Sequence, residues 1–139
     1  MKVLVDTSVW SLALRRSGAA ALGAEQVRQI SDLSDLVRDC RATMIGAIRQ
    51  ELLSGIKLAA QFEQLRTALQ AFDDCPVTGA DYELAAEFFN RCRAAGVQGS
   101  NTDFLICAVA HNHHMPIATT DGDFAYYARH LPISLHQAL

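Results

Sequence analysis

The chain has 139 residues, of which half are hydrophobic and 19% are charged, as expected for one folded domain. These values exclude a disordered tail and a small protein held together by disulfides. Twelve basic and fifteen acidic residues give a formal net charge of −3. The chain as a whole is therefore not the basic body expected of a protein that binds nucleic acid in bulk.

The cysteines Cys40, Cys75, Cys92 and Cys107 form no C-x-x-C pair, and no histidine stands beside them at the spacing of zinc ligands. We therefore expect reduced, mostly buried thiols in a cytoplasmic protein. The amino-terminal stretch loosely imitates a secretory signal, but Asp6 interrupts its apolar run. The longest fully apolar run, residues 104–110, is far shorter than the roughly 20 residues of a membrane span, so we expect no membrane segment.

Short apolar runs alternate with helical patterns along the whole chain. The predicted strands are residues 2–5, 43–45, 75–77, 117–119 and 133–135. The predicted helices are residues 7–14, 24–38, 47–53, 57–72, 79–96, 103–112 and 124–129. This alternation predicts an α/β fold, with a single domain over residues 1–139 and a mainly parallel central sheet of four to five strands flanked by helices.

Acidic residues follow the predicted strands or begin the helices after them. They are Asp6, Glu51, Asp103, Asp121 and Asp123. Ligands of open α/β sheets bind beyond the carboxyl ends of the strands, so side chains far apart in the sequence can converge there. Each residue alone has an ordinary explanation as a turn residue, a helix cap or a solvated helix residue. The combination is more specific than its parts.

Four segments carry a family resemblance: VDTSVW at residues 5–10, RQELLSG at 49–55, TDFLICAVA at 102–110 and TTDGDF at 119–124. They resemble the four blocks of the PIN domain and, more narrowly, those of the VapC-type toxins of bacterial toxin–antitoxin pairs. The resemblance covers essentially the whole chain in block order. It implies a metal-dependent endoribonuclease with a single PIN-like domain, usually dimeric and held inactive by a cognate antitoxin.

The resemblance also implies a set of site residues. Asp6 matches the first acid of the family, Glu51 the second, Asp103 the third and Asp121 the fourth, while Asp123 is an additional acid. Asp6, Asp103 and Asp121 are then the expected metal ligands. Glu51 is expected to orient a water molecule or a second ion, with Asp123 assisting.

Clustered carboxylates repel one another and raise some of their pKa values unless a cation intervenes. Mg²⁺, or Mn²⁺ as a substitute, favours oxygen ligands and keeps exchangeable water molecules. A bound ion can polarise a phosphoryl oxygen and lower the pKa of an attacking water molecule. Hydrolysis of RNA phosphodiester bonds is therefore the expected reaction.

Substrate contacts must come from outside the acid cluster. Arg49, two residues before Glu51, is the preferred candidate for a phosphate contact. Thr7 and Ser8 match the small hydroxyl residues beside the first acid and complete the expected substrate-binding set. A single-stranded loop of a structured RNA is the expected substrate, because its bases are unstacked and its phosphates are accessible.

Two alternatives remain open. His111 and His114 have the spacing of a helical metal-binding pair, although a role at the end of an apolar helix is the simpler interpretation. The chain could also be a non-catalytic PIN-like module that binds RNA or protein, which titration with Mn²⁺ would test. Removing the five proposed site acids leaves ten acids against twelve bases, so the rest of the chain is formally +2.

Overall fold

The strand β1 (Val3–Val5) lies at the centre of the sheet in this computed structural model, which describes residues 1–14 and 22–137. Its neighbours are β2 (Ala42–Thr43) and β3 (Ile117–Ala118), and both pair with it in parallel. Leu4 pairs with Thr43 on one side and with Ile117 on the other. All three residues of β1 are fully buried, which is typical of a parallel strand covered on both faces.

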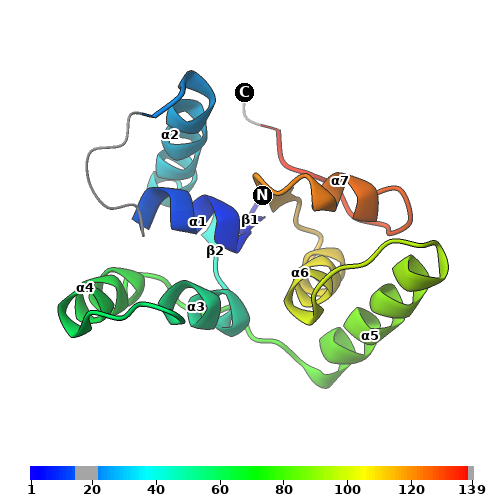
Figure 1. Ribbon diagram of the computed structural model, residues 1–139. Helices are drawn as coiled ribbons and strands as arrows, with labels where there is room; N and C mark the ends of the chain where they lie inside the picture. The colour runs from blue at the N-terminus through cyan, green and yellow to red at the C-terminus, as the bar shows by residue number, and fades with distance from the viewer. Residues whose placement is uncertain (15–21, 138–139) are drawn as a thin grey trace.

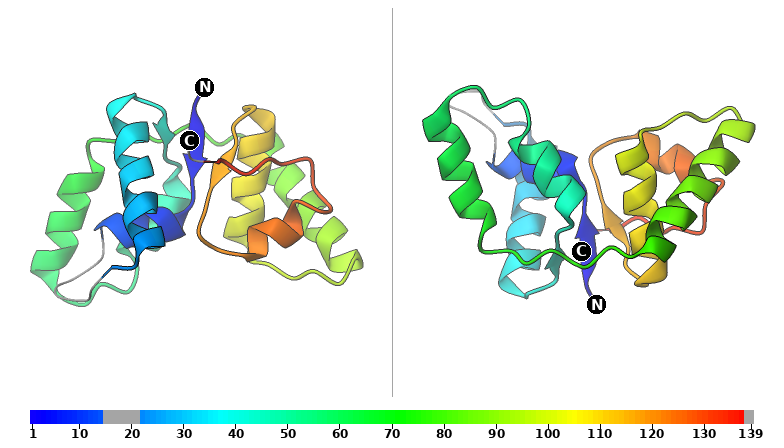
Figure 2. Two further views of the ribbon diagram at one scale, coloured as in Figure 1. Left: turned by 90° about the horizontal axis from the view of Figure 1, so that it is seen from above. Right: turned by 90° about the horizontal axis from the view of Figure 1, so that it is seen from below.

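The sheet separates two groups of helices, as Figures 1 and 2 show. The first group consists of α1 (Thr7–Leu14), α2 (Ala24–Arg38), α3 (Gly46–Leu53) and α4 (Ala59–Leu69). The second consists of α5 (Gly79–Ala94), α6 (Asn101–Asn112) and α7 (Asp123–Tyr127). The predicted α/β fold with a parallel sheet flanked by helices is confirmed.

The outer strands are shorter than predicted. In place of strands at 75–77 and 133–135, the structure has single parallel bridges between Met44 and Asp74 and between Ile117 and Leu135. Pro76 has no backbone N–H for a ladder, which helps to explain why the first of these segments pairs only once. The two bridges lie on the outer sides of β2 and β3, so five segments still run across the sheet.

The helix α6 forms the central part of the second group. Its residues 104–110 are all buried, as its continuous apolar run predicts. The carboxylate of Asp81, near the start of α5, accepts hydrogen bonds from the backbone N–H of Thr78 at 2.9 Å and from Asn112 Nδ2 at 2.7 Å. This bond from Asn112 ties the end of α6 to the beginning of α5.

Burial of the cysteines agrees only partly with the prediction. Cys92 and Cys107 are buried, Cys75 is half-buried and Cys40 is exposed. All four are free thiols. Within the described parts of the chain, no helix has both the length and the apolar character needed to cross a membrane.

Candidate active site

Asp6 follows the central strand directly and lies at the carboxyl edge of the sheet. Its backbone N–H donates to the carbonyl of Ala118 at 2.8 Å, which continues the pairing of β1 with β3. β1 has β2 on one side and β3 on the other, so connections to neighbouring strands leave β1 toward opposite sides of the sheet. Asp6 lies at this point. This is the position at which open α/β sheets bind their ligands.

Hydroxyl groups hold the carboxylate of Asp6, a residue that is only 4% exposed. Ser8 Oγ donates to Asp6 Oδ2 at 2.8 Å, and Thr119 Oγ1 donates to the same oxygen at 2.9 Å. The backbone N–H of Thr120 donates to Ser8 Oγ at 3.0 Å. Residues after β1 and after β3 thus fix the orientation of one buried carboxylate.

Asp103 enters the same region from the first turn of α6. Its backbone N–H donates to Ser100 Oγ at 3.0 Å, so Ser100 caps the helix. Burial raises the pKa of Asp103, and the negative charges of Asp6 and Asp121 raise it further, while the hydroxyl of Tyr127 opposes the shift. The charges of Asp6, Asp103 and Asp121 therefore act on one another, and a cation among them would relieve this repulsion.

Hydrogen bonds connect Asp121, Asp123 and Glu51 to neighbouring residues of the site. Asp121 donates its backbone N–H to Thr119 Oγ1 at 3.0 Å, and its Oδ1 accepts the backbone N–H of Asp123 at 2.9 Å. Thr7 Oγ1 donates to Glu51 Oε1 at 2.6 Å, which links the start of α1 to α3. Glu51 and Asp123 are exposed, whereas Asp6 is buried and the other two acids are partly buried.

Arg49 has a different environment from the predicted one. Its Nε and Nη2 donate to Asp74 Oδ1 at 3.0 and 2.8 Å, and Nη1 and Nη2 donate to the carbonyls of Leu69 and Phe72. The guanidinium group thus ties α3 to the segment that follows α4. These hydrogen bonds give Arg49 a structural role, and its contact with a phosphate stays a prediction.

The hydroxyls of Thr7 and Ser8, predicted to contact substrate, donate to Glu51 and Asp6 instead. A role in holding these acids follows directly from the contacts. Direct contact with substrate stays a prediction.

The histidines lie at the end of α6, as the simpler interpretation proposed. The helix ends at Asn112, and His113 follows as its C-terminal cap. His111 Nδ1 lies 3.1 Å from the carbonyl oxygen of Pro132, and the ring packs edge-on against Phe88. His111 therefore joins α6 to the carboxyl-terminal segment.

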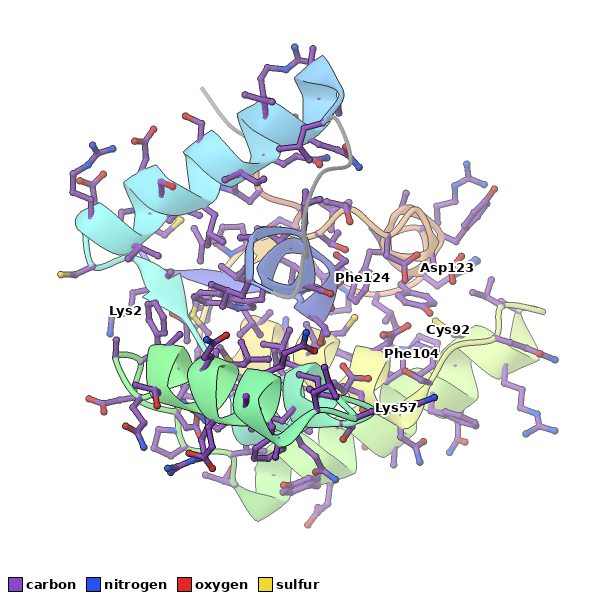
Figure 3. The ribbon with its side chains drawn as sticks, turned by 60° about the vertical axis from the view of Figure 1, so that its left-hand side comes forward. Lys2, Lys57, Cys92, Phe104, Asp123 and Phe124 are labelled. Atoms are coloured by element: carbon purple, nitrogen blue, oxygen red, sulfur yellow. The ribbon has the colours of Figure 1, made fainter. Side chains whose placement is uncertain are left out.

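From sequence alone, Tyr127 is an aromatic residue that could stack on an unpaired base, but the structure gives it a different contact. Tyr127 is fully buried in α7, and its hydroxyl donates to Asp103 Oδ2 at 2.7 Å. Its spacing of four from Asp123 places both on one helix face, which was the only available signal. In the view of Figure 3, the exposed Lys57, between α3 and α4, and Asp123 are both labelled right of centre, and Lys2 is labelled on the left.

The acids fit a hard divalent cation by their donor chemistry. Asp6, Asp103 and Asp121 offer carboxylate oxygens, which Mg²⁺ and Mn²⁺ prefer, and their mutual repulsion favours a positive ion. Over residues 1–14 and 22–137, no group of three histidine, cysteine, aspartate or glutamate side chains is already arranged to hold a metal ion. In this arrangement an ion would be held by some of these acids directly and by others through water molecules.

Solved structures with the same fold extend over nearly the whole chain. FitAcB from Neisseria gonorrhoeae is 19% identical with a TM-score of 0.73, covering 97% of this chain and 96% of its own. VapBC-5 from Mycobacterium tuberculosis, a member of the VapBC family of toxin–antitoxin systems, is 20% identical with a TM-score of 0.68, covering 99% and 98%. VapBC2 from Rickettsia felis, bound to a DNA fragment from its promoter, is 15% identical with a TM-score of 0.69, covering 98% of each chain.

No curated protein matches the chain in sequence. The family model of the PIN domain does match, over residues 3–130. This range contains β1, all seven described helices and the five acids at the carboxyl edge of the sheet. The chain belongs to the PIN domain family.

Proposed function

We propose that this chain is a metal-dependent endoribonuclease that hydrolyses RNA phosphodiester bonds and acts as the toxin of a toxin–antitoxin system. The observation that carries the proposal is the convergence of Asp6, Asp103 and Asp121 at the carboxyl edge of a PIN domain. A fold that only binds RNA would have little need for acids whose charges disfavour one another. The proposed site is therefore built for a cation and for phosphoryl chemistry.

Asp6, Asp103 and Asp121 would hold Mg²⁺, or Mn²⁺ in its place. When bound, the ion supplies positive charge for the phosphoryl oxygen and lowers the pKa of a water molecule. Ser8 and Thr119 orient the Asp6 carboxylate for this task through their hydrogen bonds to Oδ2.

Glu51 and Asp123 lie at the exposed margin of the site. We assign to Glu51, which accepts a hydrogen bond from the hydroxyl of Thr7, the orientation of a water molecule or a second ion, with Asp123 assisting from the first residue of α7. We assign two cations to the RNA backbone: Arg49, two residues before Glu51, and the exposed Lys57 between α3 and α4. A single-stranded loop of a structured RNA suits this arrangement, because its phosphates are accessible.

A cognate antitoxin and a second copy of the chain are the proposed partners, and the cytoplasm is the proposed compartment. The support for an antitoxin is that chains with this fold occur in toxin–antitoxin complexes. Large apolar side chains are also available for a partner: Val27 on α2 is 51% exposed, and Leu58 before α4 is 61% exposed.

The decisive experiment compares RNA cleavage by the purified chain and by Asp6→Asn in the presence of Mg²⁺. We expect the wild type to cut at defined bonds, found by mapping 5′ ends, and the variant to lose at least about a hundredfold in rate. The control is Asp39→Asn, which removes an exposed acid after α2, before β2 begins and so away from the carboxyl edge. Full magnesium-dependent cleavage by Asp6→Asn would refute the assignment, and absence of Mn²⁺ binding would favour the non-catalytic module.

A further inference from the structure

The side chain of Tyr127 places a single polar group at the acid cluster from within an aromatic environment. Its ring is fully buried, with the ring centroid of Phe104 at 4.9 Å and that of Phe124 at 5.1 Å. Phe104 belongs to α6, and Phe124 belongs to α7, the helix that also carries Tyr127. Figure 3 labels both phenylalanines. The aromatic packing fixes the ring, so the hydroxyl has one position, 2.7 Å from Asp103 Oδ2.

Gly99 provides the space for this hydroxyl. A Cβ atom at Gly99 would lie 2.3 Å from the hydroxyl oxygen of Tyr127 and 2.8 Å from its Cζ. Both distances are far inside van der Waals contact, and the tyrosine ring is packed too tightly to retreat. Glycine is thus required at position 99 by the tyrosine, because any larger residue would displace the hydroxyl from Asp103.

The contact with Tyr127 makes the two carboxylate oxygens of Asp103 unequal. Oδ2 accepts the phenolic hydrogen bond, and within the described residues no hydrogen bond to Oδ1 is found, although the nearby Ser100 hydroxyl also lowers the pKa of this carboxyl. A hydroxyl that donates to a carboxylate competes with a cation for that oxygen. Asp103 therefore presents Oδ1 as its freer ligand atom.

The number of carboxylate oxygens available matters for the choice of cation. Ca²⁺ takes six to eight oxygen ligands and accepts both oxygens of one carboxylate. Mg²⁺ requires octahedral geometry with shorter bonds and uses carboxylates together with several water molecules. A carboxylate restricted to one free oxygen thus disfavours Ca²⁺ relative to Mg²⁺ and Mn²⁺.

We propose that Tyr127, seated against Gly99, is a positioning residue that holds Asp103 with one oxygen free and thereby makes the site selective for small divalent cations over Ca²⁺. This inference rests on the proposed function, since it assumes that Asp103 binds the metal ion.

The experiment measures Mn²⁺ and Ca²⁺ dissociation constants by calorimetry for the wild type, Tyr127→Phe and Gly99→Ala. Tyr127→Phe keeps the buried ring and removes only the hydroxyl, so we expect it to fold. Chemical denaturation verifies that it does. We expect it to weaken Mn²⁺ binding by about tenfold, with a smaller loss for Ca²⁺ and a change of at least about threefold in their ratio. Gly99→Ala, where it folds, should change the ratio in the same direction.

The matched control is Tyr126→Phe, which removes an exposed phenolic hydroxyl one residue earlier on α7. It should leave both dissociation constants unchanged. Equal weakening of both cations by Tyr127→Phe, or no weakening, would overturn the inference while leaving the nuclease proposal intact. A wild-type chain that binds no Mn²⁺, or that binds it equally well as Asp6→Asn, would overturn both.

Discussion

At the scale of single residues, Asp103 carries an electrostatic conflict that the folded chain tolerates. Burial and the charges of Asp6 and Asp121 raise its pKa, so the ionised carboxylate is less stable in the folded state than in water. Such conflicts are typical of functional sites, where stability is reduced in favour of binding. The conflict predicts how a neutral substitution behaves without a metal ion.

We expect Asp103→Asn to raise the free energy of unfolding of the metal-free chain at pH 7 by about 0.5–2 kcal/mol. An acid whose pKa is raised by folding destabilises the fold above that pKa and has no effect below its unfolded value of about 3.9. The gain should therefore shrink as the pH falls toward 3. Urea denaturation in EDTA at both pH values measures it, and a loss of stability at pH 7 would contradict the argument.

The acids themselves could be predicted from sequence, because they occupy motif positions next to predicted strands and helices. Their partners could not. The contact between Tyr127 and Asp103 joins residues 24 positions apart, and it depends on how α7 packs against α6. For the same reason, the sequence could not show that the guanidinium group of Arg49 turns toward Asp74.

At the scale of elements, the carboxylate of Asp81 connects α5 to α6. Burial by itself would raise the pKa of Asp81, but the hydrogen bonds from Asn112 and Thr78 outweigh it and lower the pKa. Asn112 is the last residue of α6, whose first turn carries Asp103. This contact therefore helps to fix the helix that presents one of the proposed metal ligands.

We expect Asp81→Asn to lower the free energy of unfolding at pH 7 by about 1–3 kcal/mol. An amide has no charge and only one acceptor oxygen, so it cannot accept from both Asn112 Nδ2 and the backbone N–H of Thr78 as the carboxylate does. An acid whose pKa is lowered by folding stabilises the fold above its unfolded pKa. This contribution is lost as the pH falls through the folded value. Urea denaturation should thus show a smaller effect near pH 2 than at pH 7, and the exposed Glu83→Gln on the same helix should show little effect at either pH.

Helices could be located from sequence more closely than strands could. The spacing of apolar residues predicted a helix over 24–38, and α2 has the same bounds. Helical periodicity is a local property of the chain, whereas the extent of a strand depends on which neighbour offers hydrogen bonds. The segments around Cys75 and Leu135 each pair at a single position. Their apolar residues predicted longer strands than the structure has.

At the scale of the whole molecule, the location of the charge matters more than its sum. The chain has a formal charge of −3, yet five of its fifteen acids belong to the proposed site. Charges separated by more than a Debye length, about 10 Å at 0.1 M salt, act on one another only weakly. RNA that approaches the carboxyl edge should therefore respond to the acids there and hardly at all to acids elsewhere.

Two double variants with the same net charge test this argument. Asp6→Asn with Asp103→Asn and Asp39→Asn with Glu83→Gln each change the formal charge from −3 to −1. In EDTA at 0.1 M salt, where no metal-dependent cleavage can occur, we expect the first pair to bind a single-stranded RNA about threefold or more tightly than the wild type, and the second pair to differ little. Fluorescence anisotropy of a labelled oligonucleotide provides the dissociation constants. If both pairs bound the RNA more tightly by the same factor, net charge would control RNA binding. If neither pair bound it more tightly, the RNA would not bind near the acid cluster.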